Sequence, residues 1–156
     1  MTADLTKTAT TALANRLEVF RDAVRELAVP LTDAQFWAKP LEPGNSVGHL
    51  VLHLTGNLSH FVGAQLGGTG YVRDREREFT EANLPAKAEV MAQLDEAVAT
   101  FRRVVEGLDA QRLAGPYPGG HFPTVVEGLI ALVAHFALHR GQMSYIVRLV
   151  KPAEAP

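Results

Sequence analysis

Apolar residues recur at intervals of three and four positions in four long stretches of the chain, which is the spacing of amphipathic helices. In the first stretch this pattern is formed by Leu13, Leu17, Phe20, Val24 and Leu27. It predicts a helix over residues 5–28. Pro30 helps to end this helix, because proline cannot continue the backbone hydrogen bonds of a helix.

The same spacing predicts three further helices, over 47–66, 86–108 and 125–150. Ser46 is the expected N-cap of the second, and Thr124-Val125-Val126-Glu127 has the form of a capping box before the last. Four long helices without a convincing strand pattern predict an all-α four-helix bundle, as one domain over 1–156. The connections over 31–45, with one short helical turn over 34–37, and over 67–83 are long enough for crossovers.

Composition narrows the classes of function. The chain has 15 basic and 17 acidic residues, a formal net charge of −2, and no basic stripe that would indicate nucleic-acid binding. It has no cysteine, so disulfides, thiolate ligands and a cysteine nucleophile are excluded. It carries no apolar leader or membrane-spanning stretch, so we expect a cytoplasmic protein without a membrane partner. The run from Arg73 to Glu78 alternates in charge and is interpreted as a solvated loop or helix end.

Two histidines lie one helical turn apart in the last predicted helix, at His135 and His139. They share an arc of that helix with the apolar residues Leu132, Phe136, Met143, Ile146 and Val150. Buried imidazoles need partners, and one metal ion would satisfy both. The alternative is a pair of core histidines that hydrogen-bond to backbone or side chains.

A third imidazole is available from the predicted helix over 47–66, which carries His49, His53 and His60. At about 100° per residue, His53 lies nearest the apolar arc that begins at Leu50. His49 and His60 are each displaced along the helix, so we interpret them as surface residues or as neighbours of the ligands. Three histidines with an open position are typical of a catalytic zinc, but nickel or iron also accepts nitrogen ligands.

Other residues are candidates for supporting such a site. Gln142 follows His139 by three positions and Asn57 follows His53 by one turn, so each is a candidate to hydrogen-bond beside the ligands; a role in helix packing is the alternative for each. Trp37 either covers the mouth of the site or acts as a hydrophobic anchor. The sequence places no acidic residue convincingly near the histidines, which favours chemistry in which the metal itself acidifies a bound thiol or water.

Two segments resemble the DinB-like proteins, also called DinB/YfiT-like metalloenzymes. One is the stretch NSVGHLVLHL over 45–54, and the other is HFALHRGQ over 135–142, which is similar to the family motif H-x-x-x-H-R-G-Q. The resemblance implies a four-helix bundle, commonly a homodimer, with a divalent metal ion held by His53, His135 and His139. The chain also has His49 one turn before the expected position, so His49 is the alternative ligand from that helix.

Characterised members of this family include thiol-dependent transferases and a mycothiol-dependent isomerase. The resemblance therefore implies an enzyme that uses a divalent metal ion to activate a low-molecular-weight thiol for transfer to a small electrophilic substrate. The three-imidazole ligand set favours zinc or nickel as that ion, with iron as the alternative. A hydrolase that uses a metal-bound water is the second hypothesis. A non-catalytic dimeric bundle that binds a metal or a small ligand is the third.

Overall fold

The computed structural model describes residues 4–151; the ends of the predicted domain, residues 1–3 and 152–156, lie outside the described residues. In chain order its α-helices are α1 (Leu5–Ala28), α2 (Asp33–Trp37), α3 (Val47–Leu58), α4 (Arg77–Thr80), α5 (Lys87–Glu106), α6 (Ala110–Ala114) and α7 (Val125–Val150), with a π-helix η1 (Ser59–Ala64) after α3 and a 3₁₀ turn η2 (Pro118–Gly120) before α7. Residues 4–151 contain no strand, only an isolated bridge between Pro116 and Thr124. The predicted all-α class is confirmed.

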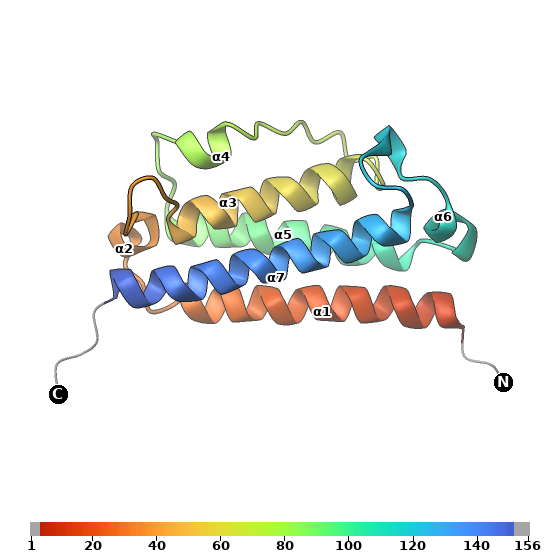
Figure 1. The fold of residues 1–156 in the computed structure, drawn as a ribbon, viewed down its shortest axis with the longest axis horizontal. Helices are drawn as coiled ribbons and strands as arrows, with labels where there is room; N and C mark the ends of the chain where they lie inside the picture. Colours follow the sequence, from red (N-terminus) through yellow and green to blue (C-terminus); the bar gives the residue numbers. More distant parts are fainter. Residues whose placement is uncertain (1–3, 152–156) are drawn as a thin grey trace.

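The four long helices α1, α3, α5 and α7 form a bundle (Figure 1). Both α1 and α3 pack against α5 and α7, so α1 and α3 lie at opposite corners. After α3 the chain returns along the outside of the bundle, through α4, to the end where α3 began (Figure 1). As a result α3 and α5 run in the same direction, while α7 runs antiparallel to α3. This return is a crossover connection, which the long loop after the second predicted helix allows.

The predicted helix starts are found where the capping residues indicate. Ser46 Oγ accepts a hydrogen bond from the His49 backbone N–H at 3.1 Å, and Thr124 Oγ1 accepts one from Glu127 at 3.3 Å. Each cap satisfies a backbone donor that has no partner within the first turn. α7 consequently covers the predicted residues Val125–Val150.

The end of the second predicted helix differs from expectation, because α3 gives way after Leu58 to the π-helix η1. There the Gln65 N–H bonds to the His60 carbonyl and the Gly67 N–H to the Val62 carbonyl, both five residues back. A π-helix shifts the apolar periodicity only slightly over one turn, so the sequence pattern does not distinguish it from an α-helix.

Two short helices, α4 and α6, lie in segments that we predicted as connections. Elements of four or five residues are too short to display a periodic pattern. The prediction of a solvated run at 73–78 is wrong for Glu78, whose side chain is only 6% exposed. This residue proves central to the site.

The core is formed by apolar side chains from all four long helices, among them the fully buried Leu17, Leu54, Phe101 and Phe136. No helix within residues 4–151 has the length and apolar character needed to cross a membrane. Polar residues are rare in the interior, and most of the buried ones lie on or against α3: Ser46, His49, His53, Asn57 and Glu78. Buried polar groups need partners, so this side of α3 marks the candidate site.

Candidate metal centre

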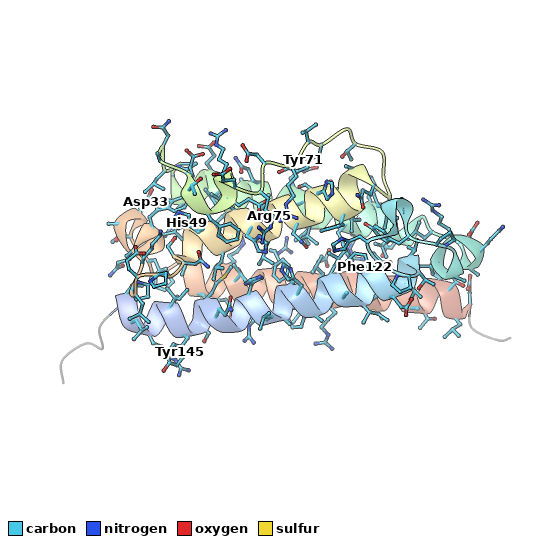
Figure 2. All side chains as sticks on the ribbon, turned by 45° about the horizontal axis from the view of Figure 1, so that its top comes forward. Asp33, His49, Tyr71, Arg75, Phe122 and Tyr145 are labelled. Carbon is cyan, nitrogen blue, oxygen red and sulfur yellow. The ribbon has the colours of Figure 1, made fainter. Side chains whose placement is uncertain are left out.

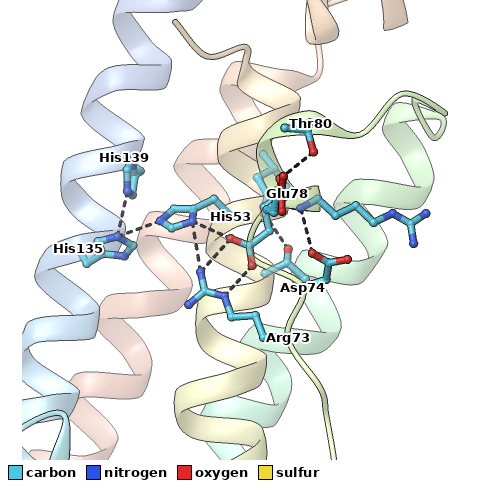
Figure 3. A network of polar contacts seen from close by, with 11 residues as sticks. His53, Arg73, Asp74, Glu78, Thr80, His135 and His139 are labelled. Atoms are coloured by element: carbon cyan, nitrogen blue, oxygen red, sulfur yellow. Dashed lines mark hydrogen bonds and ion pairs between the residues drawn. The ribbon is translucent and has the colours of Figure 1, made fainter.

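Three imidazole rings converge between α3 and α7, from His53, His135 and His139 (Figure 3). His135 Nε2 lies 3.1 Å from His53 Nε2 and 3.0 Å from His139 Nε2. The antiparallel packing of α3 and α7 brings the rings together, because one turn of α7 presents two imidazoles to the single one on α3. His53 is buried, and the other two are half-buried.

The outer nitrogens of two of these rings have hydrogen-bond acceptors. His53 Nδ1 donates to Glu78 Oε2 at 2.9 Å, and His139 Nδ1 donates to Gln142 Oε1 at 2.7 Å. Each Nδ1 therefore carries the hydrogen. In a neutral imidazole the Nε2 atom is then unprotonated and has a free lone pair. Both lone pairs are directed at His135 Nε2.

The three facing nitrogens do not have enough hydrogens to satisfy one another. His135 Nε2 carries one hydrogen at most, so at least one lone pair in the cluster is left without a donor. His135 Nδ1 is also buried and has no hydrogen-bond partner among the described residues. A divalent cation accepts all three lone pairs at once. Nitrogens about 2 Å from one ion lie about 3 Å apart. The two separations to His135 Nε2 match this value, and all three ligand atoms lie within 4.8 Å of one another, so this donor set fits a metal ion.

The surroundings keep the imidazoles of His135 and His139 neutral. Burial lowers the pKa of His135 to about 4, and the neighbouring His139 and His53 act in the same direction. Burial likewise lowers the pKa of His139, although its hydrogen bond to Gln142 opposes the change. Neutral imidazoles are the form that binds metal, so these two rings are ready as ligands near neutral pH.

Glu78 is a residue of the candidate site that the sequence did not predict. Its carboxylate accepts from Arg73 Nε at 2.6 Å and from Arg73 Nη2 at 2.8 Å, in addition to the hydrogen bond from His53. Burial acts to raise the pKa of Glu78 and is the largest single influence. The hydrogen bonds and charges of Arg73 and His53 together outweigh it, so the pKa is lowered. Glu78 is thus a charged acceptor that fixes the His53 ring.

A glycine on α3 makes room for this carboxylate. A Cβ atom added at Gly56 would lie 2.0 Å from Glu78 Oε1. Glycine within a helix costs about 1 kcal/mol relative to alanine, so a mid-helix glycine three residues after His53 is a signal of close approach. That signal is present in the sequence, but it does not say which residue approaches.

The remaining predicted neighbours of the site are found at different places. His49 is buried one turn before His53 and accepts from Ser46 Oγ at 2.6 Å through Nδ1, so it is held away from the three-histidine group. Trp37 packs on Gly48 and on the His49 ring, at 5.3 Å between ring centres, and its Nε1 donates to the Pro85 carbonyl. Trp37 therefore anchors the crossover segment beside α3.

Asn57 lies one turn after His53 and is buried, and its Oδ1 has no hydrogen-bond partner among the described residues. His60 lies on the π-helix beside Gln65, with 3.3 Å between His60 Nε2 and Gln65 Nε2. His121 is exposed in the loop before α7 and stacks on Phe61 at 4.7 Å between ring centres. Neither His60 nor His121 joins the three-histidine group.

A groove lies beside the site along the C-terminal half of α7. It has a volume of about 380 Å³, and Gln142, the hydrogen-bond partner of His139, forms part of its wall. The rest of the lining is largely apolar and comes from the 40–45 loop, α3 and α7: Pro40, Leu41, Pro43, Gly44, Asn45, Leu50, Tyr145, Ile146 and Leu149. A small molecule in this groove would lie next to Gln142.

The fold and the site together define a class of protein: a four-helix bundle with a crossover, carrying three imidazoles on antiparallel α3 and α7. Comparison with known families agrees, since the sequence profile of the DinB superfamily matches residues 16–143. The chain belongs to the DinB superfamily. No curated protein matches the chain.

A solved structure with the same fold is a conserved protein from Enterococcus faecalis. It superposes with a TM-score of 0.75 at 18% sequence identity, covering 90% of this chain and 96% of that one. At this identity the likeness shows the fold alone.

Proposed function

We propose that the protein is a metal-dependent enzyme that activates a small thiol for attack on an electrophilic substrate, with His53, His135 and His139 as ligands. The observation that carries the proposal is the convergence of three Nε2 atoms. In His53 and His139 the Nε2 atom is left with a free lone pair, because Nδ1 donates its hydrogen to Glu78 and to Gln142 respectively. A divalent ion bound there would lower the pKa of a thiol or water and so supply a nucleophile near neutral pH.

The lack of a free carboxylate beside the three histidines favours a thiol over water as the nucleophile. Glu78 is the carboxylate next to the ligands, and both of its oxygens are already occupied by Arg73 and His53. It therefore orients His53 and is not free to take a proton from a nucleophile. A thiol has an ordinary pKa of about 8.5 and needs little help to ionise, whereas water needs much more. Metal-dependent hydrolysis stays the second candidate.

We propose that the groove beside Gln142 receives the electrophilic substrate. Its mainly apolar lining suits a substrate with an apolar group. Its lining also includes Gln142, which hydrogen-bonds to His139. Zinc and nickel are the proposed ions, with iron as the alternative, because an all-imidazole donor set accepts each of them. A homodimer is part of the proposal.

The experiment that tests the activity compares substrates on metal-loaded protein. Protein would be incubated with a low-molecular-weight thiol plus an electrophile, and separately with activated esters and amides. We expect turnover that requires the thiol, that is lost in His135→Ala and that is kept in His121→Ala, the matched control outside the group. Turnover of esters without thiol would support the hydrolase instead. Stoichiometric metal without turnover of either kind would support a binding protein.

A further inference from the structure

Arg73 places a guanidinium group beside the three histidines, and the chain uses only part of its hydrogen-bonding capacity. The side chain is 10% exposed, and its Nε and Nη2 atoms donate to the two carboxylate oxygens of Glu78. Nη1 has no hydrogen-bond partner among residues 4–151 and remains accessible to solvent. Figure 3 shows the guanidinium next to the His53 ring, with Nη1 outside the marked contacts. A charged donor is therefore available to a bound molecule.

The guanidinium of Arg73 lies along α3, between His53 and Phe61, which are about two helical turns apart. Nη2 is 3.3 Å from His53 Nδ1, and Cζ is 6.0 Å from the centre of the Phe61 ring. Between these two residues, a Cβ atom at Gly56 would lie 3.5 Å from Nε. Burial is the main reason that the pKa of His135 is lowered, and the charge of Arg73 adds to it. A molecule held by the three histidines would therefore have Arg73 as a neighbour.

Two buried polar atoms near this guanidinium also lack partners. Asn57 follows Gly56 on α3, is 7% exposed, and has no hydrogen-bond partner at Oδ1 among the described residues. It lies one turn after His53 and about 40° from it around the helix, so both side chains face α7. On α7, His135 Nδ1 is the second such atom. Unpaired buried polar atoms are rare in folded proteins and call for an explanation, such as a bound water or ion.

The charges around the three histidines favour a ligand with more than one negative group. Glu78 and Arg73 carry opposite charges that cancel, and the imidazoles of His135 and His139 are neutral. A divalent ion would bring two positive charges, and one thiolate would balance only one of them. Within the described chain no acidic side chain joins the histidines to supply the other. Because net charge is costly to bury, a second anionic group on the ligand is favoured, and arginine binds carboxylates especially well.

We propose that Arg73 recognises a carboxylate on the thiol that binds at the three histidines, with Nη1 donating to the carboxylate and the Asn57 amide beside it. This inference rests on the proposed function and names its substrate class: a small thiol with a carboxylate a few atoms from the sulfur. Asn57 lies beyond His53 toward the N-terminal half of α7, whereas the groove beside Gln142 follows the C-terminal half. The thiol and the electrophile would thus approach the histidines from different sides.

The test compares two thiols of equal length, mercaptopropionate and mercaptopropionamide, on protein loaded with Co(II). Thiolate-to-cobalt absorption reports binding at the ion, and titration gives each dissociation constant. Mercaptopropionate should bind about tenfold more tightly or better, because only it offers a charged acceptor to Arg73. The preference should fall to about twofold in Arg73→Lys, which keeps a positive charge for Glu78 but lacks the planar set of donors. Arg75→Lys, at an exposed residue of the same segment, should keep the full preference.

Two results of this titration bear on Arg73 directly. An unchanged preference in Arg73→Lys would overturn the inference, since the carboxylate would then be bound by the cobalt itself. Asn57→Leu is the second variant, because it leaves the ion pair of Arg73 with Glu78 intact and is informative even where Arg73→Lys folds poorly. It should lower the preference several-fold with an unchanged circular dichroism spectrum, and a full preference in folded Asn57→Leu would remove Asn57 from the site.

The same measurements separate this inference from the proposed function. Equal affinities for the two thiols, each with thiolate-to-cobalt absorption, would overturn the carboxylate site and leave thiol activation standing. Absence of that absorption with both thiols would instead count against thiol activation. Calorimetry with propionate, which has no thiol, then decides the carboxylate site: binding that is weakened in Arg73→Lys and kept in Arg75→Lys supports it, and binding that is absent or equal in both variants overturns it.

Discussion

At the scale of single residues, the chemistry of the site depends on which nitrogen of each imidazole carries the hydrogen. Glu78 and Gln142 set this for His53 and His139, and each does so through one hydrogen bond to Nδ1. Such partners usually affect metal affinity almost as strongly as the ligands do. The buried ion pair of Glu78 with Arg73 keeps the carboxylate charged for this task.

Substitution of Glu78 tests this role directly. Glu78→Gln should weaken metal binding by about 10- to 100-fold, because His53 loses a charged acceptor, and should destabilise the fold by about 1–3 kcal/mol, because Arg73 loses its charged partner. Competition with a chelating dye would measure affinity, and ¹⁵N NMR of the metal-free protein would report the His53 tautomer. The control is Glu76→Gln, which alters an exposed residue of the same segment. Unchanged affinity and tautomer would show that Glu78 has no positioning role.

Gly56 provides a second residue-scale prediction. Gly56→Ala should destabilise the protein, although alanine favours helix by about 1 kcal/mol, because the new methyl group would displace the Glu78 carboxylate. In a Glu78→Ala background the same change should be neutral or stabilising, since the obstacle is gone. A double-mutant cycle by urea unfolding measures the difference. Equal effects in both backgrounds would contradict the proposed close approach.

At the scale of elements, α1 and α5 are joined by an ion pair as well as by apolar packing. Arg102 donates to both carboxylate oxygens of Glu18, at 2.6 and 2.8 Å. The hydrogen bond from Arg102 is the main reason that the pKa of Glu18 is lowered. This pair lies on the side of the bundle formed by α1 and α5, away from the histidines of α3 and α7, so it reports on helix packing without touching the site.

Its contribution to stability should depend on pH. The pKa of Glu18 is lower in the folded state than in the unfolded chain, so the pair stabilises the fold above the ordinary carboxyl pKa and the gain is lost as pH falls through the folded value. Glu18→Gln should therefore cost about 0.5–1 kcal/mol at neutral pH and almost nothing well below pH 4. Urea unfolding at both pH values measures this, with Glu26→Gln on the exposed part of α1 as control. A difference that persists in acid would argue against an ionic contribution.

At the scale of the whole molecule, the sequence predicted those features that depend on neighbours along the chain. The periodic apolar residues indicated the long helices, and Ser46 and Thr124 marked where two of them begin. The spacing of His135 and His139 also indicated that both would face the same neighbour. The resemblance to the DinB family pointed to His53, and the structure brings its ring to the other two.

The features that the sequence did not predict depend on residues far apart in the chain. Glu78 reaches His53 across the return segment after α3, and its run of alternating charges is typical of a solvated loop. Glu78 differs from its charged neighbours only in the folded chain, where it forms a buried ion pair with Arg73. The π-helix and the short helices α4 and α6 were missed because each is shorter than the repeat needed to recognise it.

The most direct measurement of the central claim is the metal content of protein purified without contact with an affinity metal. We expect about one divalent ion per chain, with X-ray absorption spectra indicating imidazole ligands. His53→Ala, His135→Ala and His139→Ala should each abolish stoichiometric uptake, because two imidazoles bind an ion poorly, whereas His60→Ala should retain it. Full uptake by any of the three ligand variants, in protein that remains folded, would contradict the assignment of that histidine as a ligand.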